Sequence, residues 1–129
     1  MQVICPLEVW VSSNKKFILN LNNYRNTHFR VLTKAKKEYS ALLAPQLRNK
    51  QCFDKVKLTY TLYPKTARIL DVSNPCSIID KFACDALVQN GVLPDDNYKH
   101  VVEISFKFGA VDKDNPRCEL SIDEFCNTC

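Results

Sequence analysis

Five aspartates in one segment are the residues of this chain best suited to chemistry. They fall between Ile69 and Val101. Some of them directly precede an expected helix and others the strand after it, so a hairpin-like packing of helix and strand would let them converge. Carboxylate oxygens are common ligands of Mg²⁺, which lowers the pKa of a bound water and neutralises charge on an attacked phosphate. The five residues are Asp71, Asp80, Asp85, Asp95 and Asp96.

The expected helix between Asn74 and Gly91 sorts these side chains by face. At about 100° per residue, Asn74, Lys81 and Asp85 share one stripe beside the apolar face. Asp80 points about 100° away from Lys81 and flanks the other edge of that face. A lysine near metal-bound carboxylates can stabilise charge that develops on a phosphate. Lys81 and Asp85 therefore extend the candidate cluster for phosphodiester hydrolysis.

A simpler interpretation of the same residues stays open. The run Asp-Asp-Asn at 95–97 is also an ordinary turn sequence. Asp71 and Ser73 also suit the start of a helix, where they favour its dipole. Lys81 and Asp85 also suit a surface ion pair that contributes a few tenths of a kcal/mol. On residue pattern alone, this account fits slightly better than a metal site does.

The charges divide the chain into a basic and an acidic half. Residues 1–70 carry 13 Lys and Arg against 3 acids, whereas residues 71–129 carry 5 basic and 11 acidic residues. Lysine and arginine release condensed counterions when they contact DNA phosphates, so the basic half suits a polyanion. The acidic half suits hard cations. Solvated surface charge on both halves is the alternative, and it requires no partner.

Other function classes lack their motifs. The chain has only 2 glycines, so neither the P-loop nor the G-x-G-x-x-G phosphate site is possible, and we expect no nucleotide cofactor. No G-x-S-x-G or H-E-x-x-H sequence is present. We also find no secretory signal and no run of about 18 apolar residues, and therefore expect a cytoplasmic protein without a membrane segment.

The 7 cysteines do not indicate a disulfide framework, because their number is odd and the expected compartment is reducing. Cys126 and Cys129 form a single C-x-x-C at the end of the sequence. Structural zinc normally needs a second pair of ligands, so we expect free thiols there. Cys76 and Cys84 are expected to pack as small apolar groups.

Periodicity predicts one α+β domain over residues 1–129, with a small mixed sheet and two main helices. Four Asn residues within 20–26 predict a polar loop, and Pro45 should end or kink the first helix. Asn74 should cap the second helix, with Pro75 at its first position and Gly91 after its last turn. The expected strands are 7–12, 16–21, 56–62, 102–108 and a last one around 120–122, with helices at 29–43 and 74–91.

The motifs of the second half resemble the RusA-type Holliday junction endodeoxyribonucleases of bacteria and their phages. That family's pattern is a basic run, D-x-D-N, a lysine, D-A-L, G-V and D-D. The resemblance covers most of the chain and is specific over residues 68–101. The matching residues are Arg68, Asp71-Val72-Ser73-Asn74, Lys81, Asp85-Ala86-Leu87, Gly91-Val92 and Asp95-Asp96.

The resemblance implies three aspartates that hold Mg²⁺ or Mn²⁺. By position, Asp71 and Asp96 would be two of them, but Ser73 stands where the family has its second aspartate. The connection from Asp71 to Asp85 is also about four residues longer than in compact members, roughly one helical turn. Asp80, Asp85 or Asp95 could replace the missing carboxylate. Helix geometry favours Asp85 if the site lies on the Lys81 side, and Asp80 remains open if the longer connection rotates the helix.

The resemblance further implies a homodimer that binds a four-way DNA junction and nicks two opposed strands. It would act in a bacterial cell, encoded by the bacterium or by a phage. Residues assigned by this reasoning to phosphate contacts, the first two with most support because they precede Asp71, are Lys65, Arg68, Asn74, Lys15, Lys16, Arg25, Arg30 and Lys34.

The leading hypothesis is thus a metal-dependent junction resolvase whose catalytic residues are Asp71, Lys81, Asp85 and Asp96. A second hypothesis, motivated by Ser73, is a non-catalytic DNA-binding protein of the same fold. A third is a small cytoplasmic interaction protein without a nucleic-acid role, against which the basic first half argues.

Overall fold

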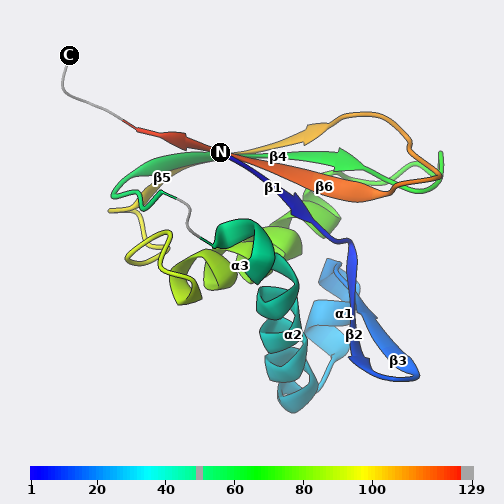
Figure 1. The fold of residues 1–129 in the computed structure, drawn as a ribbon. Coiled ribbons are helices and arrows are strands. Elements are labelled where there is room, and N and C mark those ends of the chain that lie inside the picture. Colours follow the sequence, from blue (N-terminus) through cyan, green and yellow to red (C-terminus); the bar gives the residue numbers. More distant parts are fainter. Residues whose placement is uncertain (49–50, 126–129) are drawn as a thin grey trace.

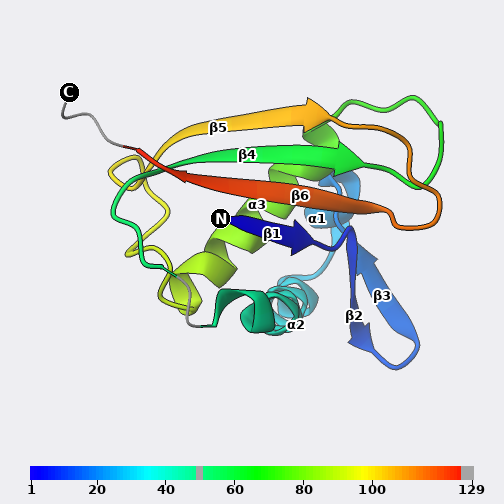
Figure 2. The ribbon, with the colours of Figure 1, turned by 45° about the horizontal axis from the view of Figure 1, so that its top comes forward.

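The computed structural model describes residues 1–48 and 51–125, and its centre is a four-stranded mixed sheet. The strand order is β1-β6-β4-β5. β4 pairs in parallel with β5 and antiparallel with β6, which in turn pairs antiparallel with β1. The sheet therefore has β1 at one edge and β5 at the other (Figure 2). The strands are β1 (Gln2–Cys5), β4 (Val56–Tyr63), β5 (Val101–Phe108) and β6 (Arg117–Glu124).

Three helices lie on one face of this sheet, and a separate hairpin packs beside them (Figure 1). Burial follows the same layering: alternate residues of β4 are fully buried beneath the helices, whereas those between them are half-buried on the other face. The remaining elements are β2 (Glu8–Ser12), β3 (Lys15–Ile18), α1 (Leu21–Asn26), α2 (Phe29–Leu47) and α3 (Ser73–Gln89). The expected α+β class with a mixed sheet and two long helices is confirmed.

The sequence analysis missed two short elements. β1 has only four residues, and its exposed Ile4 obscures the alternation of buried Val3 and Cys5. α1 lies where the sequence predicted a polar loop: Oδ1 of Asn20 accepts a hydrogen bond from the backbone N–H of Asn23 at 2.8 Å and begins a helix. Asparagine is one of the best helix N-caps, so the same residue type serves either structure.

α3 forms because its apolar residues recur at helical spacing on one wide face. Ile78, Ile79, Phe82, Ala83 and others of this face are completely buried. They pack against the sheet and against α2, so the helix lies between two layers of the molecule (Figure 1). A helix buried on so much of its surface leaves only narrow polar edges, and these edges carry its charged side chains.

The predicted cap at the start of α3 was wrong, whereas its predicted end is confirmed. The helix begins at Ser73, and Asn74 does not cap it. Instead, Oδ1 of Asn74 accepts a hydrogen bond from the backbone N–H of Leu21 at 3.0 Å and so joins α3 to α1. Gly91 ends the helix as expected, with φ of 77° and with the N–H of Val92 bonded to the carbonyl of Leu87 at 2.9 Å.

Pro45 does not end α2, which continues to Leu47. The proline lies in the last turn, so its missing N–H costs a single helical hydrogen bond. Buried Leu43 and Leu47 on either side hold this turn against the core. The expected helix end at Leu43 was therefore wrong.

Two sequence-based expectations concern membranes and cysteines. Among the described residues, no helix is both long and apolar enough to cross a membrane. Cys76 and Cys84 pack as buried free thiols, as expected. Cys126 and Cys129 lie outside the described residues.

Replacing Gly91 tests the left-handed end of α3. We expect Gly91→Ala to lower the free energy of unfolding by about 1 kcal/mol, because an L-side chain is strained at positive φ. No atom lies within 4 Å of an added Cβ, so the loss reflects backbone strain alone. Urea unfolding measures it. Gly91→Asn serves as the control and should lose less, since asparagine tolerates this conformation; an equal loss in both variants would contradict the assignment.

Candidate functional site

The connection between α3 and β5 carries two neighbouring exposed carboxylates, Asp95 and Asp96. The carboxylate of Asp95 accepts hydrogen bonds from the backbone N–H of Asp96 at 2.7 Å and from Nδ2 of Asn97 at 3.1 Å. Partial loss of solvation, a hydrogen bond with Asp95 and repulsion from Asp85 raise the pKa of Asp96. We call Asp85, Asp95 and Asp96 the acidic cluster.

Asp85 reaches this cluster from α3, and Lys36 of α2 partly neutralises it. Nζ of Lys36 lies 3.3 Å from Oδ2 of Asp85. The same Nζ lies 5.9 Å from the ring centres of Tyr24 and Phe82, whose faces attract a cation. The sequence analysis did not single out Lys36. Its position directly after buried Ala35, at the border of the apolar stripe of α2, was the available signal.

Asp80 lies at the opposite edge of α3 and faces the sheet. Its Oδ1 accepts hydrogen bonds from the hydroxyl of Tyr60 at 2.7 Å and from the thiol of Cys84 at 3.3 Å. Burial, followed by the carboxylates of Asp80 and Asp96, raises the pKa of Cys84. Asp80 is thus engaged with β4 and supports the packing of α3 on the sheet.

The predicted polar stripe of α3 is confirmed by its contacts with α1 and α2. Asn74 bonds to the start of α1, Nζ of Lys81 lies 5.9 Å from the ring centre of Tyr24 in α1, and Asp85 pairs with α2. Asp80 is on the other edge, as helix geometry predicted. Lys81 and Asp85 therefore share one side of the helix.

Asp71 lines a cleft of about 470 Å³ at the start of α3. Arg68 and Asn74 line the same cleft, together with residues of β3 and α1. The structure thus brings Asp71 together with two of the residues expected to contact DNA. Lys65 is exposed in the same connection between β4 and α3, and Arg25 is exposed in the last turn of α1.

Asp71 and the acidic cluster lie near opposite ends of α3. The 17 residues of the helix span about 25 Å at about 1.5 Å per residue. Asp71 precedes the helix, whereas Asp96 lies close enough to its last turns for the charge of Asp85 to raise the pKa of Asp96 and for Asp96 to raise that of the Cys84 thiol. The two ends of α3 lie at opposite sides of the molecule (Figure 2).

This separation corrects the expected convergence of Asp71 and Asp96 within one chain. A rigid helix stands between them, and the connection after it does not return to its start. Within residues 1–48 and 51–125, no group of three or more His, Cys, Asp or Glu side chains is positioned to hold a metal ion. Binding of Mg²⁺ or Mn²⁺ stays a prediction, and one chain in this conformation does not assemble the three-aspartate set.

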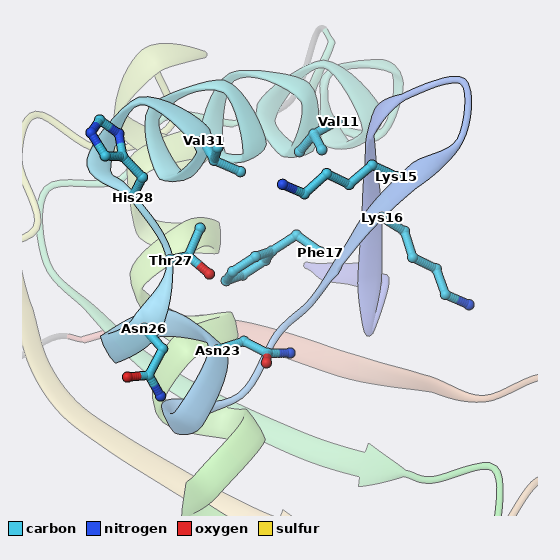
Figure 3. A pocket seen from close by; sticks show the side chains of 9 residues that line it. All are labelled: Val11, Lys15, Lys16, Phe17, Asn23, Asn26, Thr27, His28 and Val31. Atoms are coloured by element: carbon cyan, nitrogen blue, oxygen red, sulfur yellow. The ribbon is translucent and has the colours of Figure 1, made fainter.

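A basic hollow lies between the β2–β3 hairpin and the start of α2 (Figure 3). It has a volume of about 280 Å³, and its lining includes Lys15 and Lys16 together with Thr27 and His28. Lys15 extends across it toward α2, whereas Lys16 points away from α2. Lys16 instead pairs with Glu8 at 3.3 Å.

A second hollow of about 330 Å³ adjoins the first, with Lys15 and Val31 lining both. Its lining adds Arg30 and Lys34 from the first two turns of α2. Three residues from the predicted set of DNA contacts therefore gather in one place, beside the positive end of a 19-residue helix that has no acid in its first turn. We call Lys15, Arg30 and Lys34 the basic patch.

Comparisons with known proteins leave the family resemblance untested. No family model matches this chain, and no curated protein matches it either. The resemblance therefore rests on the motif residues themselves.

The pKa of Asp96 provides a test of the acidic cluster. We expect it above the usual aspartate value of about 3.9, and we expect Asp95→Asn to lower it, because the substitution removes the hydrogen bond with the Asp95 carboxyl group and its repulsion. Carbon-detected NMR titration of the carboxyl group measures both. Asp123→Asn, an exposed change on β6, should leave it unaltered.

The same shift has a consequence for stability. A raised pKa means that the folded protein favours the protonated form, so the free energy of unfolding falls as pH rises through the pKa of Asp96. Asp96→Asn should therefore be more stable than wild type at neutral pH, by an amount that disappears in acid. The gain is small because the side chain is exposed.

Proposed function

We propose that this protein is a metal-dependent, structure-specific endodeoxyribonuclease that resolves four-way DNA junctions by paired strand nicking. The observation that supports it most is the acidic cluster, in which the hydrogen-bonded neighbours Asp95 and Asp96 lie within range of the charge of Asp85. Carboxylates that repel one another are stabilised when a cation binds between them. The motifs that resemble the RusA-type family suggest phosphodiester hydrolysis as the reaction.

The residue types of the acidic cluster suit Mg²⁺ or Mn²⁺, although within the described residues of one chain they are not grouped around one ion position. Asp85, Asp95 and Asp96 offer carboxylate oxygens, which hard divalent cations prefer. When bound, such an ion would lower the pKa of a water and neutralise charge on the scissile phosphate. Asp96 is exposed, whereas Asp95 would have to exchange its hydrogen bonds from the Asp96 N–H and from Asn97 for the ion, and Asp85 its contact with Lys36.

Asp71 would reach the same metal only from a second copy of the chain. Helix α3 holds it far from the acidic cluster of its own chain, at the opposite end. A two-fold arrangement with the two α3 helices antiparallel places the start of one helix beside the end of the other. A homodimer of this kind would contain two equivalent sites, as nicking of two strands requires.

The basic patch is the proposed contact for the DNA backbone. Lys15, Arg30 and Lys34 line adjoining hollows at the positive end of α2, a favourable place for phosphate groups. Arg68 and Asn74, which line the cleft with Asp71, would bind the strand nearer to the reacting phosphate.

One observation favours the non-catalytic alternative. Ser73 replaces a carboxylate of the family pattern, and its three candidate replacements already have partners. Asp80 binds Tyr60, Asp85 binds Lys36, and Asp95 accepts a hydrogen bond from Asn97. A DNA-binding protein of this fold would keep the basic patch and lack nicking activity with either metal. A protein that binds no DNA even at low salt would instead support an interaction role.

Cleavage of a labelled synthetic four-way junction tests the nuclease proposal. With Mg²⁺ or Mn²⁺ we expect symmetric nicks, which EDTA abolishes. Asp71→Asn and Asp96→Asn should each reduce nicking on the order of 100-fold or more while junction binding survives, because both groups act on the reacting centre. Asp123→Asn is the matched control. Wild-type nicking rates in both the Asp71→Asn and Asp96→Asn variants would contradict the nuclease proposal.

Mixing the two inactive variants tests the shared site. In a heterodimer of Asp71→Asn and Asp96→Asn chains, one site has lost both carboxylates and the other keeps both. We therefore expect single-strand nicking to return in the mixture. A mixture as inactive as its components, with heterodimers demonstrated, would show that each site belongs to one chain.

Salt dependence tests the basic patch. Each phosphate contact contributes about 0.9 to the slope of log binding constant against log salt. Lys15→Ala should therefore bind junction DNA more weakly and reduce this slope by about one unit. Fluorescence anisotropy over a series of salt concentrations measures it. Lys113→Ala, an exposed lysine between β5 and β6, is the control, and an equal change in both variants would place the DNA elsewhere.

A further inference from the structure

The two edges of the four-stranded sheet differ in how the chain covers them. At the β1 edge, the side chain of Gln46 donates from Nε2 to the carbonyl of Ile4 at 2.9 Å and accepts from its N–H at 2.7 Å. This bidentate contact occupies the open backbone groups of a short strand. Natural proteins commonly block edge strands in such ways, because an open edge pairs with other strands.

The β5 edge has no such cover among the described residues. β5 is eight residues long and pairs on one side only, with β4. Between Val102 and Phe108, the described chain provides no hydrogen bond to its outer backbone groups. A long, open edge strand is a ready partner for another strand.

The helix-facing side of β5 is apolar and uncovered. Ile104, Phe106 and Phe108 are in register with Leu58, Tyr60 and Leu62 of β4, which are buried beneath the helices. Of these three residues of β5, only Phe106 is half-buried, and its ring meets the Tyr60 ring edge-on with centroids 5.8 Å apart. The exposed fractions of the other apolar residues are 38% for Val102, 44% for Ile104 and 55% for Phe108.

The other face of β5 carries a self-complementary charge pattern. Glu103, Ser105 and Lys107 alternate along it. If a second β5 lies antiparallel and Ser105 faces Ser105, then Glu103 of each copy faces Lys107 of the other. Centring the pair on Glu103 or on Lys107 would instead oppose like charges, which is unfavourable.

The same register also matches the apolar row. It opposes Val102 with Phe108 and Ile104 with Phe106 of the second copy, so that large and branched side chains cover one another. Every residue pair is then favourable on both faces. Because the pattern complements itself about one two-fold axis, a second copy of this chain fits it better than an unrelated strand does.

We propose that this protein forms a homodimer through antiparallel pairing of its β5 strands, centred on Ser105. The pairing continues the sheet across the two copies and puts both sets of helices on the same face. It depends only on the edge strand, so it holds whether or not the protein cleaves DNA.

Charge reversal tests the register. We expect wild type to dimerise in sedimentation equilibrium without DNA or metal. Glu103→Lys and Lys107→Glu should each raise the dimer dissociation constant roughly tenfold or more, because each turns two attractive pairs into repulsive ones. An equimolar mixture of the two variants should restore dimers, since every pair is then attractive again. The double variant E103K/K107E should also dimerise.

Controls separate this pairing from other causes. Glu103 lies 3.8 Å from Lys57 in its own chain, so Glu103→Lys is also expected to disturb the monomer slightly. Lys107→Glu breaks no ion pair among the described residues and is the cleaner variant. Asp123→Lys, on β6, should dimerise like wild type. A monomeric wild type at the highest attainable concentration, or variants that all dimerise equally, would overturn the proposal.

Discussion

Phe82 lies where α2, α3 and the β2–β3 hairpin meet, and its contacts hold these three parts together. Its ring stacks on Phe17 of β3 at 5.6 Å and meets Tyr39 of α2 edge-on at 5.5 Å. The hydroxyl of Tyr39 in turn donates to the carbonyl of Pro6 at 2.7 Å. Aromatic pairs of this geometry add to the stabilisation from buried area. The hairpin and α2, which form the basic patch, are thereby fixed relative to α3.

This packing determines where the charged side chains of α3 lie, because the helix has only two polar edges. Lys36 crosses the face of Phe82 to reach Asp85 on one edge, and Tyr60 reaches Asp80 from the sheet on the other. Both contacts join an acid of α3 to a neighbouring element. The remaining acids of the segment lie beyond the helix ends and are exposed, so they are the ones available to bind an external cation.

Sequence periodicity predicted the long elements and the faces of α3, since a rotation of about 100° per residue places Lys81 with Asp85 and separates Asp80. It missed α1, because asparagine serves caps and loops alike. The predicted convergence of Asp71 and Asp96 was wrong because the rise of a 17-residue helix separates its two ends by about 25 Å. The length of this helix could be read from the sequence. The ion pair of Lys36 depends on how two helices pack, which local pattern does not specify.

The packing of α3 also limits how its length can change in evolution. One inserted residue would rotate everything after it by about 100°, which would turn Lys81 and Asp85 away from α1 and α2 and bury a charge. Four inserted residues complete about one turn and nearly restore each orientation. In families built around such a helix, the length of the helix should therefore vary by whole turns. The lengths that occur would then show which faces of the helix are constrained.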